Sequence, residues 1–337
     1  MLRYLARRLV LLLFLMIGIS LIVFLLSHAV PSDPVVANLS QRNLANEEMV
    51  AAFRAKWGLD KPLYRQYITY LGNLLHGDMG ISIRTQRPVF DDLARYFPAT
   101  VELACLGILF AVIFGILFGV ISAIKRNTLT DHLLRGFSVF GVSVPSFWLA
   151  LIMLFVFYLG LGIAPGPGRI SARIALPVHR TGFFTLDALA MGNFPLLLDV
   201  MSHLVLPGIC LGMFTMGLIT RTTRSNLLEI LSQDYIRTAH AKGLREGDVI
   251  RKHALGNALI PVVTVIGVGF GNLLSGMVLV ETIFAWPGIG QYAFQSAQNL
   301  DFPAIMGVSL LIALNYVIIN LVIDLLYGFL DPRVRYR

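Results

Sequence analysis

Long uncharged apolar runs are the feature that most restricts the folds open to this chain. A helix needs about 20 residues to cross about 30 Å of hydrocarbon, and six runs reach that length. They cover residues 9–30, 103–124, 136–160, 200–220, 254–280 and 302–323, the last continuing past Asp324 to residue 330. Inside a bilayer no water satisfies the backbone, so each run must fold as a helix. We predict an all-α integral membrane protein with six transmembrane helices.

The charge of the chain supports this class and sets an orientation. Only 14% of residues are charged, whereas soluble domains carry about a quarter. The net charge of +8 lies mostly in short loops, which indicates topology rather than nucleic-acid binding. The dense basic segments are the two termini, residues 125–135 and residues 221–252. We therefore predict that both termini and these loops are cytoplasmic.

The N-terminal run leaves an alternative open. Ser27 and Ala29 would form a small-x-small cleavage site of a secretory signal peptide. The run is longer than a typical signal core and more spans follow it, so a retained first helix is favoured. We predict three parts: residues 1–30 with the first span, an external helical loop at 31–98, and a five-helix core at 99–337 that includes a cytoplasmic loop at 221–256.

The external loop has helix signals. Asn46 can cap a helix over residues 47–57, and Pro62 is a suitable first residue for a second helix ending at Leu75. Such a loop can receive an external partner or simply pack as a cap on the bundle. The candidate partner contacts are Phe53, Trp57, Tyr64 and Tyr67.

Residues 281–294, in the third predicted outer loop, read ETIFAWPGIGQYAF. Its proline and glycines are expected to break a helix at the membrane edge. Trp286 and Tyr292 suit an interfacial location. The candidate gate residues at the pore mouth are Glu281, Trp286, Pro287 and Gly288.

Small residues and prolines within the spans predict close packing and kinks. Gly115 and Gly119, and likewise Gly267 and Gly271, have the spacing that lets helix backbones approach. The three span prolines, which can line a cavity or only bend a helix, are Pro145, Pro207 and Pro261.

The basic segment at 221–252 carries seven Lys and Arg residues between two apolar spans. Asp234 is expected to cap a short helix from Tyr235 to Lys242, and Gly243 is expected to end it in a left-handed conformation. This exposed helix is where a soluble partner can act on the chain. The candidate coupling residues are Asp234, Tyr235, Arg237, Ala239, Lys242 and Gly243.

Recognisable catalytic chemistry is missing from the sequence. It contains no G-x-x-x-x-G-K-[S/T], H-E-x-x-H or G-x-S-x-G motif, and its histidines and two cysteines lack metal-ligand spacing. Glu102, Glu281 and Asp324 lie near span ends rather than at the centre, which disfavours a proton relay. We predict no enzyme activity, no bound cofactor and no metal. An ion-driven secondary transporter and an intramembrane enzyme are the alternatives.

Several motifs together resemble permease subunits of binding-protein-dependent ABC importers. The resemblance is strongest in DYIRTAHAKGL (234–244) and HALGNALIPVVT (253–264), and it extends to ARRL (6–9), HGDMGISIRTQRPV (76–89), ETIFAWPGIG (281–290) and NLVIDLLYGFLDPRVR (320–335). The nearest group is the first permease of dipeptide, oligopeptide and nickel systems. Arg237 and Thr238 stand where the broader family has Glu and Ala, which bears on which ATPase residues are contacted.

The resemblance implies a type I importer fold and a heteromeric complex in a bacterial or archaeal cytoplasmic membrane. The implied partners are a second homologous permease, two ATPases that carry ATP and Mg, an external solute-binding protein and the lipid bilayer, with no nucleic acid. It implies alternating access for small peptides, with nickel-chelate, glutathione or opine cargo as alternatives.

Overall fold

The structure is a computed structural model that describes residues 2–29, 46–57, 60–174, 181–275 and 278–330. Helices make up most of this part, and an isolated bridge joins Ile81 to Pro88. The chain divides into two compact units, one of Met1–Pro98 with Pro287–Val317 and the other of Ala99–Trp286 with Ile318–Arg337. The all-α prediction is confirmed. The three-part division of the chain stays a prediction.

The first unit contains the segment that was predicted to form an external loop. Its helices are α1 (Leu2–Ala29), α4 (Glu47–Trp57), α5 (Leu63–Leu75), the start of α6 (Val89–Ile124), α15 (Ile289–Gln298) and the start of α16 (Phe302–Leu330). Asn46 caps α4 as predicted, since its side-chain oxygen accepts from the N–H groups of Glu48 (3.0 Å) and Met49 (3.3 Å). Pro62 is the N-cap of α5 rather than its first residue.

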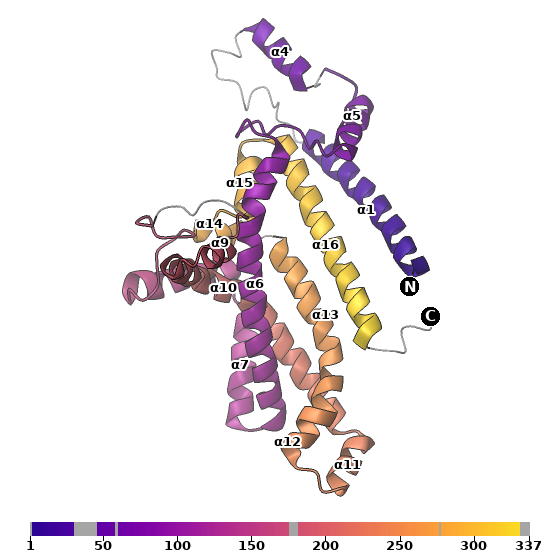
Figure 1. Ribbon diagram of the computed structural model, residues 1–337, viewed down its shortest axis with the longest axis vertical. Helices are drawn as coiled ribbons and strands as arrows, with labels where there is room; N and C mark the ends of the chain where they lie inside the picture. Colours follow the sequence, from indigo (N-terminus) through magenta and orange to yellow (C-terminus); the bar gives the residue numbers. More distant parts are fainter. Residues whose placement is uncertain (1, 30–45, 58–59, 175–180, 276–277, 331–337) are drawn as a thin grey trace. The chain divides into compact units, whose positions relative to one another are not determined.

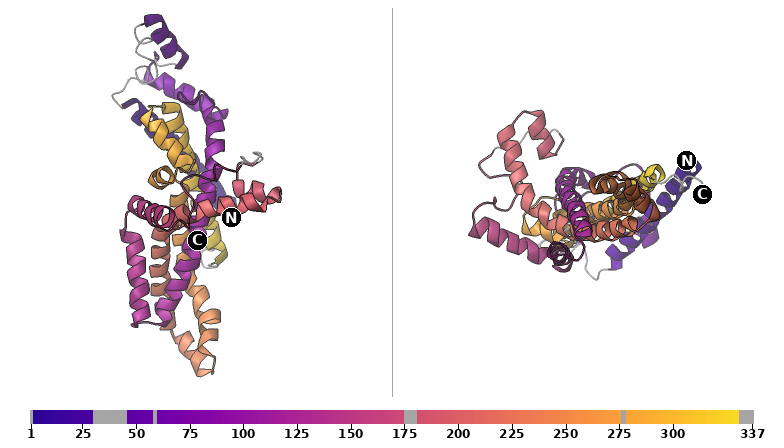
Figure 2. Two further views of the ribbon diagram at one scale, coloured as in Figure 1. Left: turned by 90° about the vertical axis from the view of Figure 1, so that its left-hand side faces the viewer. Right: turned by 90° about the horizontal axis from the view of Figure 1, so that it is seen from below.

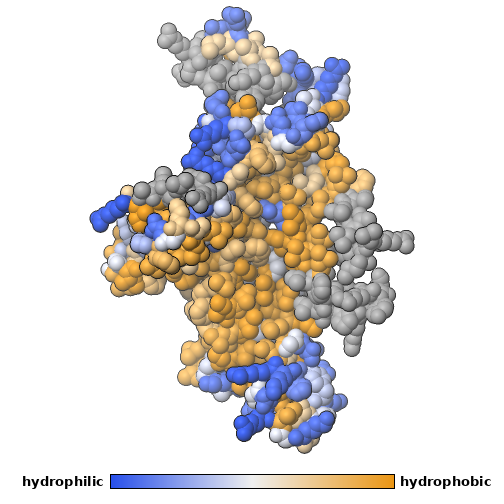
Figure 3. All heavy atoms as spheres, viewed as in Figure 1, coloured by the Kyte–Doolittle hydropathy of each residue, from blue (hydrophilic) through white to orange (hydrophobic). Residues whose placement is uncertain are grey.

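The second unit holds the rest of α6 and most of the apolar helices (Figure 1). They are α7 (Leu129–Ser143), α8 (Ser146–Met153), the π-helical turn η1 (Leu154–Gly160), α9 (Phe184–Ala190), α10 (Phe194–Leu231), α11 (Asp234–Ala241), α12 (Glu246–Asp248), the π-helical turn η2 (Val249–Ala254), α13 (Leu255–Leu274) and α14 (Val278–Ile283). Figure 3 shows hydrophobic surface over α6, α7 and α13 and hydrophilic surface over α11 and α12.

Four helical segments in the described part are long and apolar enough to cross a membrane. They are Val89–Ile124, Phe194–Leu231, Glu246–Leu274 and Phe302–Ile323. The pair α7 and α8–η1 would make a fifth, and α1 contributes a shorter apolar stretch at Leu12–Leu26. The span expected at 254–280 therefore ends earlier, at Leu274.

The run at 136–160, for which the sequence predicted a span interrupted at Pro145, is divided between two helices. α7 and the α8–η1 segment are bent by 107° at a short break, visible in Figure 1 and Figure 2. Pro145 causes the break, because its ring excludes the preceding residue from helical backbone angles. Val144 has φ −79° and ψ 127° accordingly, and Pro145 becomes the N-cap of α8. Pro207 and Pro261, by contrast, lie inside the continuous helices α10 and α13.

Glycines join α10 closely to its neighbours. A Cβ added to Gly115 of α6 would lie 2.7 Å from the Cβ of Ile219, and one on Gly119 would lie 2.6 Å from the Cβ of Thr223. These distances are too short for any larger side chain, so the predicted close approach is confirmed for this pair.

A second glycine seam lies between α10 and α7. A Cβ on Gly217 of α10 would lie 2.6 Å from the backbone oxygen of Ser138, and one on Gly141 of α7 would lie 2.9 Å from that of Met213. The helices α6, α7 and α10 therefore pack backbone against backbone along two seams.

Candidate functional site

The short helix α11 begins one residue earlier than the sequence suggested. Gln233 is its N-cap, no side chain caps it, and Asp234 is its first residue. The prediction that Asp234 caps the helix is therefore wrong. Its carboxylate lies 3.4 Å from Nη1 of Arg237 and still favours the helix, because negative charge in a first turn interacts well with the helix dipole.

Gly243 ends α11 in the left-handed conformation that was predicted, with φ 76°. The N–H of Gly243 donates to the carbonyl of His240 (2.9 Å), and the N–H of Leu244 donates to that of Ala239 (3.4 Å). This pair of bonds is a Schellman motif. A Cβ on Gly243 would meet nothing within 4 Å, so backbone angle rather than space demands glycine here.

One face of α11 packs on the membrane helices. Ile236 and Ala239 are buried there. The residues in the same apolar cluster are Ala123 of α6, Leu227 of α10, Val249 and Ala254 of η2, and Ala258 of α13. We call this cluster the apolar base of α11. Of the candidate coupling residues, Ala239 belongs to this base. Asp234, Tyr235, Arg237, Lys242 and Gly243 are exposed.

Tyr235 ties α11 to the start of α13. Its hydroxyl donates to the carbonyl of His253 (3.4 Å) and accepts from Nδ2 of Asn257 (3.1 Å). The helix is therefore held both by an apolar base and by polar bonds at its edge.

A buried ion pair lies close to this base and was missed from the sequence. Asp131 of α7 accepts from Nε and Nη2 of Arg224 on α10, both at 2.8 Å. It also accepts from the N–H of Asn127 (3.0 Å) and from the hydroxyl of Ser122 on α6. Because Ser122 adjoins Ala123 and Arg224 is three residues before Leu227, the ion pair supports the same helix ends on which α11 rests.

A second buried ion pair joins Arg169, in the segment that follows η1, to Glu102 of α6. Glu102 accepts from Nη2 (2.6 Å) and Nε (3.2 Å) of Arg169, and from the N–H and hydroxyl of Thr185, both at 2.7 Å. The guanidinium carbon of Arg169 lies 3.7 Å from the ring centre of Phe184. Burial lowers the pKa of Arg169 and the Glu102 carboxylate opposes that shift. Glu102 is thus fully used as a structural acceptor.

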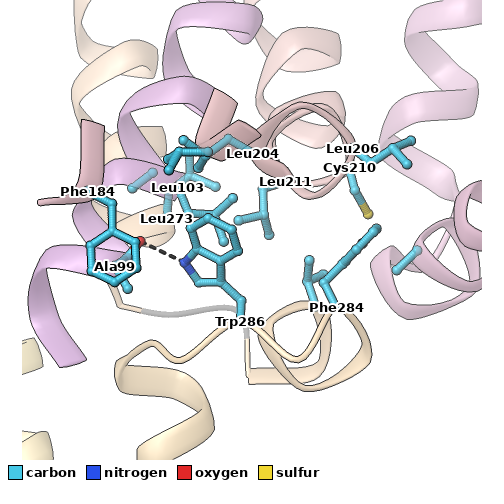
Figure 4. Packing of buried hydrophobic residues seen from close by; sticks show 14 of the residues in the cluster. Ala99, Leu103, Phe184, Leu204, Leu206, Cys210, Leu211, Leu273, Phe284 and Trp286 are labelled. Atoms are coloured by element: carbon cyan, nitrogen blue, oxygen red, sulfur yellow. Dashed lines mark hydrogen bonds between the residues drawn. The ribbon is translucent and has the colours of Figure 1, made fainter. Parts of the chain in front are cut away.

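Two of the candidate gate residues, Glu281 and Trp286, lie in the second unit. Glu281 is buried and accepts from the hydroxyl of Thr100 at 2.8 Å. Trp286 is 0% exposed, and its Nε1 donates to the carbonyl of Ala99 at 2.8 Å (Figure 4). The N–H of Trp286 also donates to the carbonyl of Glu281 at 2.7 Å. Trp286 is a core residue here rather than the interfacial anchor that was predicted.

The first unit contains the remaining gate candidates, Pro287 and Gly288. Tyr292 is also fully buried there, against the expectation of an interfacial position. Its hydroxyl donates to Asp92 (3.2 Å) and its ring stacks on Tyr96 with centroids 4.9 Å apart. Burial and the Asp92 carboxylate raise the pKa of Tyr292 above its usual value, so the hydroxyl remains a donor.

The four candidate partner contacts in the predicted external loop have different surroundings. The side chains of Phe53 and Trp57 lie outside the described part. Tyr64 is exposed. The hydroxyl of Tyr67 lies 3.0 Å from Oγ of Ser20 on α1. Among the described residues no group of three His, Cys, Asp or Glu is placed to hold a metal.

Comparison with known proteins identifies the family. Residues 115–336 match the family described as "Binding-protein-dependent transport system inner membrane component", and residues 1–104 match the family of its N-terminal part. The match to the first family covers well over half of the chain.

Curated relatives support the same family assignment. A probable D,D-dipeptide transport system permease protein of Escherichia coli K12 is 46% identical over 94% of this chain and 93% of its own length. The dipeptide permease DppB of Alkalihalophilus pseudofirmus is 43% identical and the glutathione permease GsiC of Escherichia coli O6:H1 is 37% identical, each over 100% of both chains.

The solved structure is the MetNI methionine ABC transporter in inward-facing conformations. It aligns with a TM-score of 0.51 and 17% identity over 71% of this chain and 96% of that chain, which supports the fold alone. The chain therefore belongs to the inner membrane components of binding-protein-dependent transport systems, as a permease subunit of an ABC importer with the type I fold.

Proposed function

We propose that this permease forms half of a translocation pathway for small peptides and works by alternating access. Its partners would be a second homologous permease, two cytoplasmic ATPases that hold ATP and Mg, and an external solute-binding protein. Both termini and α11 would face the cytoplasm, as the density of basic residues there indicates. The family supports the general assembly, and the dipeptide permeases among the relatives support peptide cargo.

The geometry of α11 carries the coupling part of this proposal. It is a short helix with a buried apolar base, an exposed face with Tyr235, Arg237 and Lys242, and a Schellman end at Gly243. A surface of this kind lets an ATPase push or pull on α6, α10 and α13 through one rigid contact. Docking must differ in free energy between the two permease states, since only differential affinity shifts an equilibrium.

We test coupling with the substitution Gly243→Leu in the reconstituted transporter. A side chain in the left-handed conformation costs about 1–2 kcal/mol and would reorient the end of α11. We expect assembly to be retained, with a loss of ATP-driven uptake and of ATPase stimulation by the loaded binding protein.

Gly247→Leu is the matched control, because Gly247 of α12 lies four residues away, is exposed, has no positive φ and has no atom within 4 Å of an added Cβ. Uptake and stimulation in Gly243→Leu equal to the unmodified transporter would refute the coupling role.

Cargo is tested on the partner binding protein by calorimetry with an L,L-dipeptide, a D,D-dipeptide and glutathione. We expect a dipeptide to bind most tightly. Glutathione is the second candidate, because a glutathione permease aligns over the full length of this chain, and its tighter binding would replace the peptide proposal.

A further inference from the structure

The apolar helix α13 has one face that its own chain leaves open. Asn257, Pro261, Val268 and Asn272 are exposed, and Thr264 between them is half-buried. At about 100° per residue these five positions fall within about 80° of one another around the helix. From the first to the last they extend about 22 Å at 1.5 Å per residue, most of a hydrocarbon core about 30 Å thick. We call these five residues the open face of α13.

The two sides of α13 that flank the open face pack on helices of the same unit. A Cβ on Gly269 would lie 2.5 Å from Cγ2 of Thr215 on α10, and a Cβ on Gly267 would collide with Ile323 of α16. By helical spacing these glycines lie about 100° to either side of the open face. Close contacts between membrane helices favour small residues, and these two glycines are used within the chain. The open face itself is not built for close helix packing.

The open face carries polar groups that lipid does not satisfy. Asn272 exposes a side-chain amide, and Oγ1 of Thr264 has no hydrogen-bond partner among the described residues. Pro261 has no N–H, so the carbonyl of Asn257 lacks the helical donor that this position normally supplies. Polar groups without partners are costly in hydrocarbon. Lipid is therefore a poor cover for this face.

Asn272 lies at the depth of the apolar spans rather than beyond them. Its neighbour Leu273 packs in the same apolar cluster as Leu103 of α6, and a Cβ on Gly107 would lie 3.5 Å from Cδ1 of Leu273. Gly107 is inside the uncharged run 103–124. Polar side chains at this depth face the interior of a bundle or a water-filled cavity.

The N-terminal end of the open face is bonded to α11. Nδ2 of Asn257 donates to the hydroxyl of Tyr235 at 3.1 Å, and the next residue, Ala258, belongs to the apolar base of α11. A displacement of α11 therefore acts directly on α13. This link suits a surface whose surroundings change with the state of the transporter.

We propose that the open face of α13 lines the peptide pathway, an inference that deepens the function proposed above and rests on it. The side chains of Thr264 and Asn272 exchange hydrogen bonds with the N–H and C=O groups of the peptide in transit. Those groups are common to all peptides, and the five residues of the open face carry no charge. The face therefore passes a zwitterionic peptide without holding it in an ion pair.

Water access is tested with single cysteines in the assembled transporter in lipid nanodiscs, after Cys105→Ala and Cys210→Ala remove the natural thiols. The test variants are Val268→Cys and Asn272→Cys. The matched controls are Leu109→Cys and Ile113→Cys, on an exposed apolar face of α6. A water-soluble methanethiosulfonate reagent is added without nucleotide and again with ATP and vanadate.

We expect both α13 cysteines to react in at least one of these two states and both α6 controls to stay unreactive. Lack of reaction at the α13 positions in both states would overturn the proposal, because lipid or the second permease would then cover the face. This measurement needs no cargo. Absence of ATP-driven peptide uptake by the unmodified transporter would instead refute the proposed function and leave the water access of α13 standing.

Contact with the peptide is tested by Asn272→Asp. Uptake of an acidic and a basic dipeptide is measured in competition, both supplied by the same binding protein. The new carboxylate should lower the ratio of acidic to basic uptake about fivefold, as for like charges about 4 Å apart in water. Asn272→Gln keeps the amide and should keep the ratio of the unmodified transporter. An unchanged ratio in Asn272→Asp would show that this position does not meet the peptide and would overturn the proposal.

Discussion

The ion pair between Asp131 and Arg224 should make a large contribution to the stability of the helix ends on which α11 rests. The Asp131 side chain is 0% exposed, that of Arg224 is 20% exposed, and two bonds of 2.8 Å join them. Removing one partner of a buried pair costs about 3–5 kcal/mol, because a charge is left without compensation. For Asp131→Asn we expect the lower end, about 3 kcal/mol, since the guanidinium of Arg224 can regain some water.

A double-mutant cycle isolates the interaction. Arg224→Gln leaves a carboxylate that only Ser122 and Asn127 still bond, so it should destabilise at least as much as Asp131→Asn. The double variant should be more stable than the sum of the two single effects predicts, by about 2–3 kcal/mol, the upper range for residues in direct contact.

The assay is thermal unfolding of the purified transporter at one scan rate. For a unit of this size, 1 kcal/mol corresponds to roughly 2–4 °C, so Asp131→Asn should lower the midpoint by roughly 6–12 °C. The control is Asp248→Asn, which removes an exposed pair with Lys252 at 3.1 Å and should change the midpoint by less than about 3 °C. A midpoint shift below about 3 °C for Asp131→Asn, or single effects that add in the double variant, would refute a stabilising ion pair between Asp131 and Arg224.

Three other substitutions test the packing described above. Gly119→Leu should destabilise by about 1–3 kcal/mol or more, since its Cβ would lie 2.6 Å from that of Thr223. Trp286→Phe should cost about 1–3 kcal/mol, because the carbonyl of Ala99 loses its donor. Arg169→Met should cost about 3–5 kcal/mol by leaving a buried carboxylate unpaired. Each is read as a shift in the unfolding midpoint, and an unchanged midpoint contradicts the corresponding contact.

The matched control for the glycine substitution is Gly136→Leu, because a Cβ at Gly136 meets nothing within 4 Å. It should leave the unfolding midpoint within about 2 °C of the unmodified transporter, as expected for a surface substitution. Equal destabilisation by the two leucines would show that helix seams play no special part.

Local chemistry made much of the fold predictable. Apolar runs mark the spans because the bilayer imposes helix on them, and α4 has the predicted bounds because Asn46 caps it through the adjacent backbone. Gly243 was predictable for the same reason, since a left-handed helix end favours glycine. The bend at Pro145 was recognisable only as a possible kink, because sequence alone does not decide whether a span absorbs a proline or breaks at it.

The buried ion pairs could not be predicted in this way. Glu102 and Arg169 are 67 residues apart in sequence, and Asp131 and Arg224 are 93 apart. No local spacing links such residues, and their pairing follows only from how the helices meet in space. The signal that was available, an acidic residue within a strongly basic turn at 125–135, pointed to Asp131 without naming its partner.

The glycine seams along α10 limit where the permease can move. Sliding α10 past α6 or α7 by one residue would bring Ile219, Thr223 or their neighbours against positions that have room only for hydrogen. These three helices are therefore expected to move as one rigid body, so that a displacement at the C-terminal end of α10 is transmitted to its N-terminal end. The joint that opens and closes the pathway has to be sought elsewhere, at boundaries between helices that are not locked in this way.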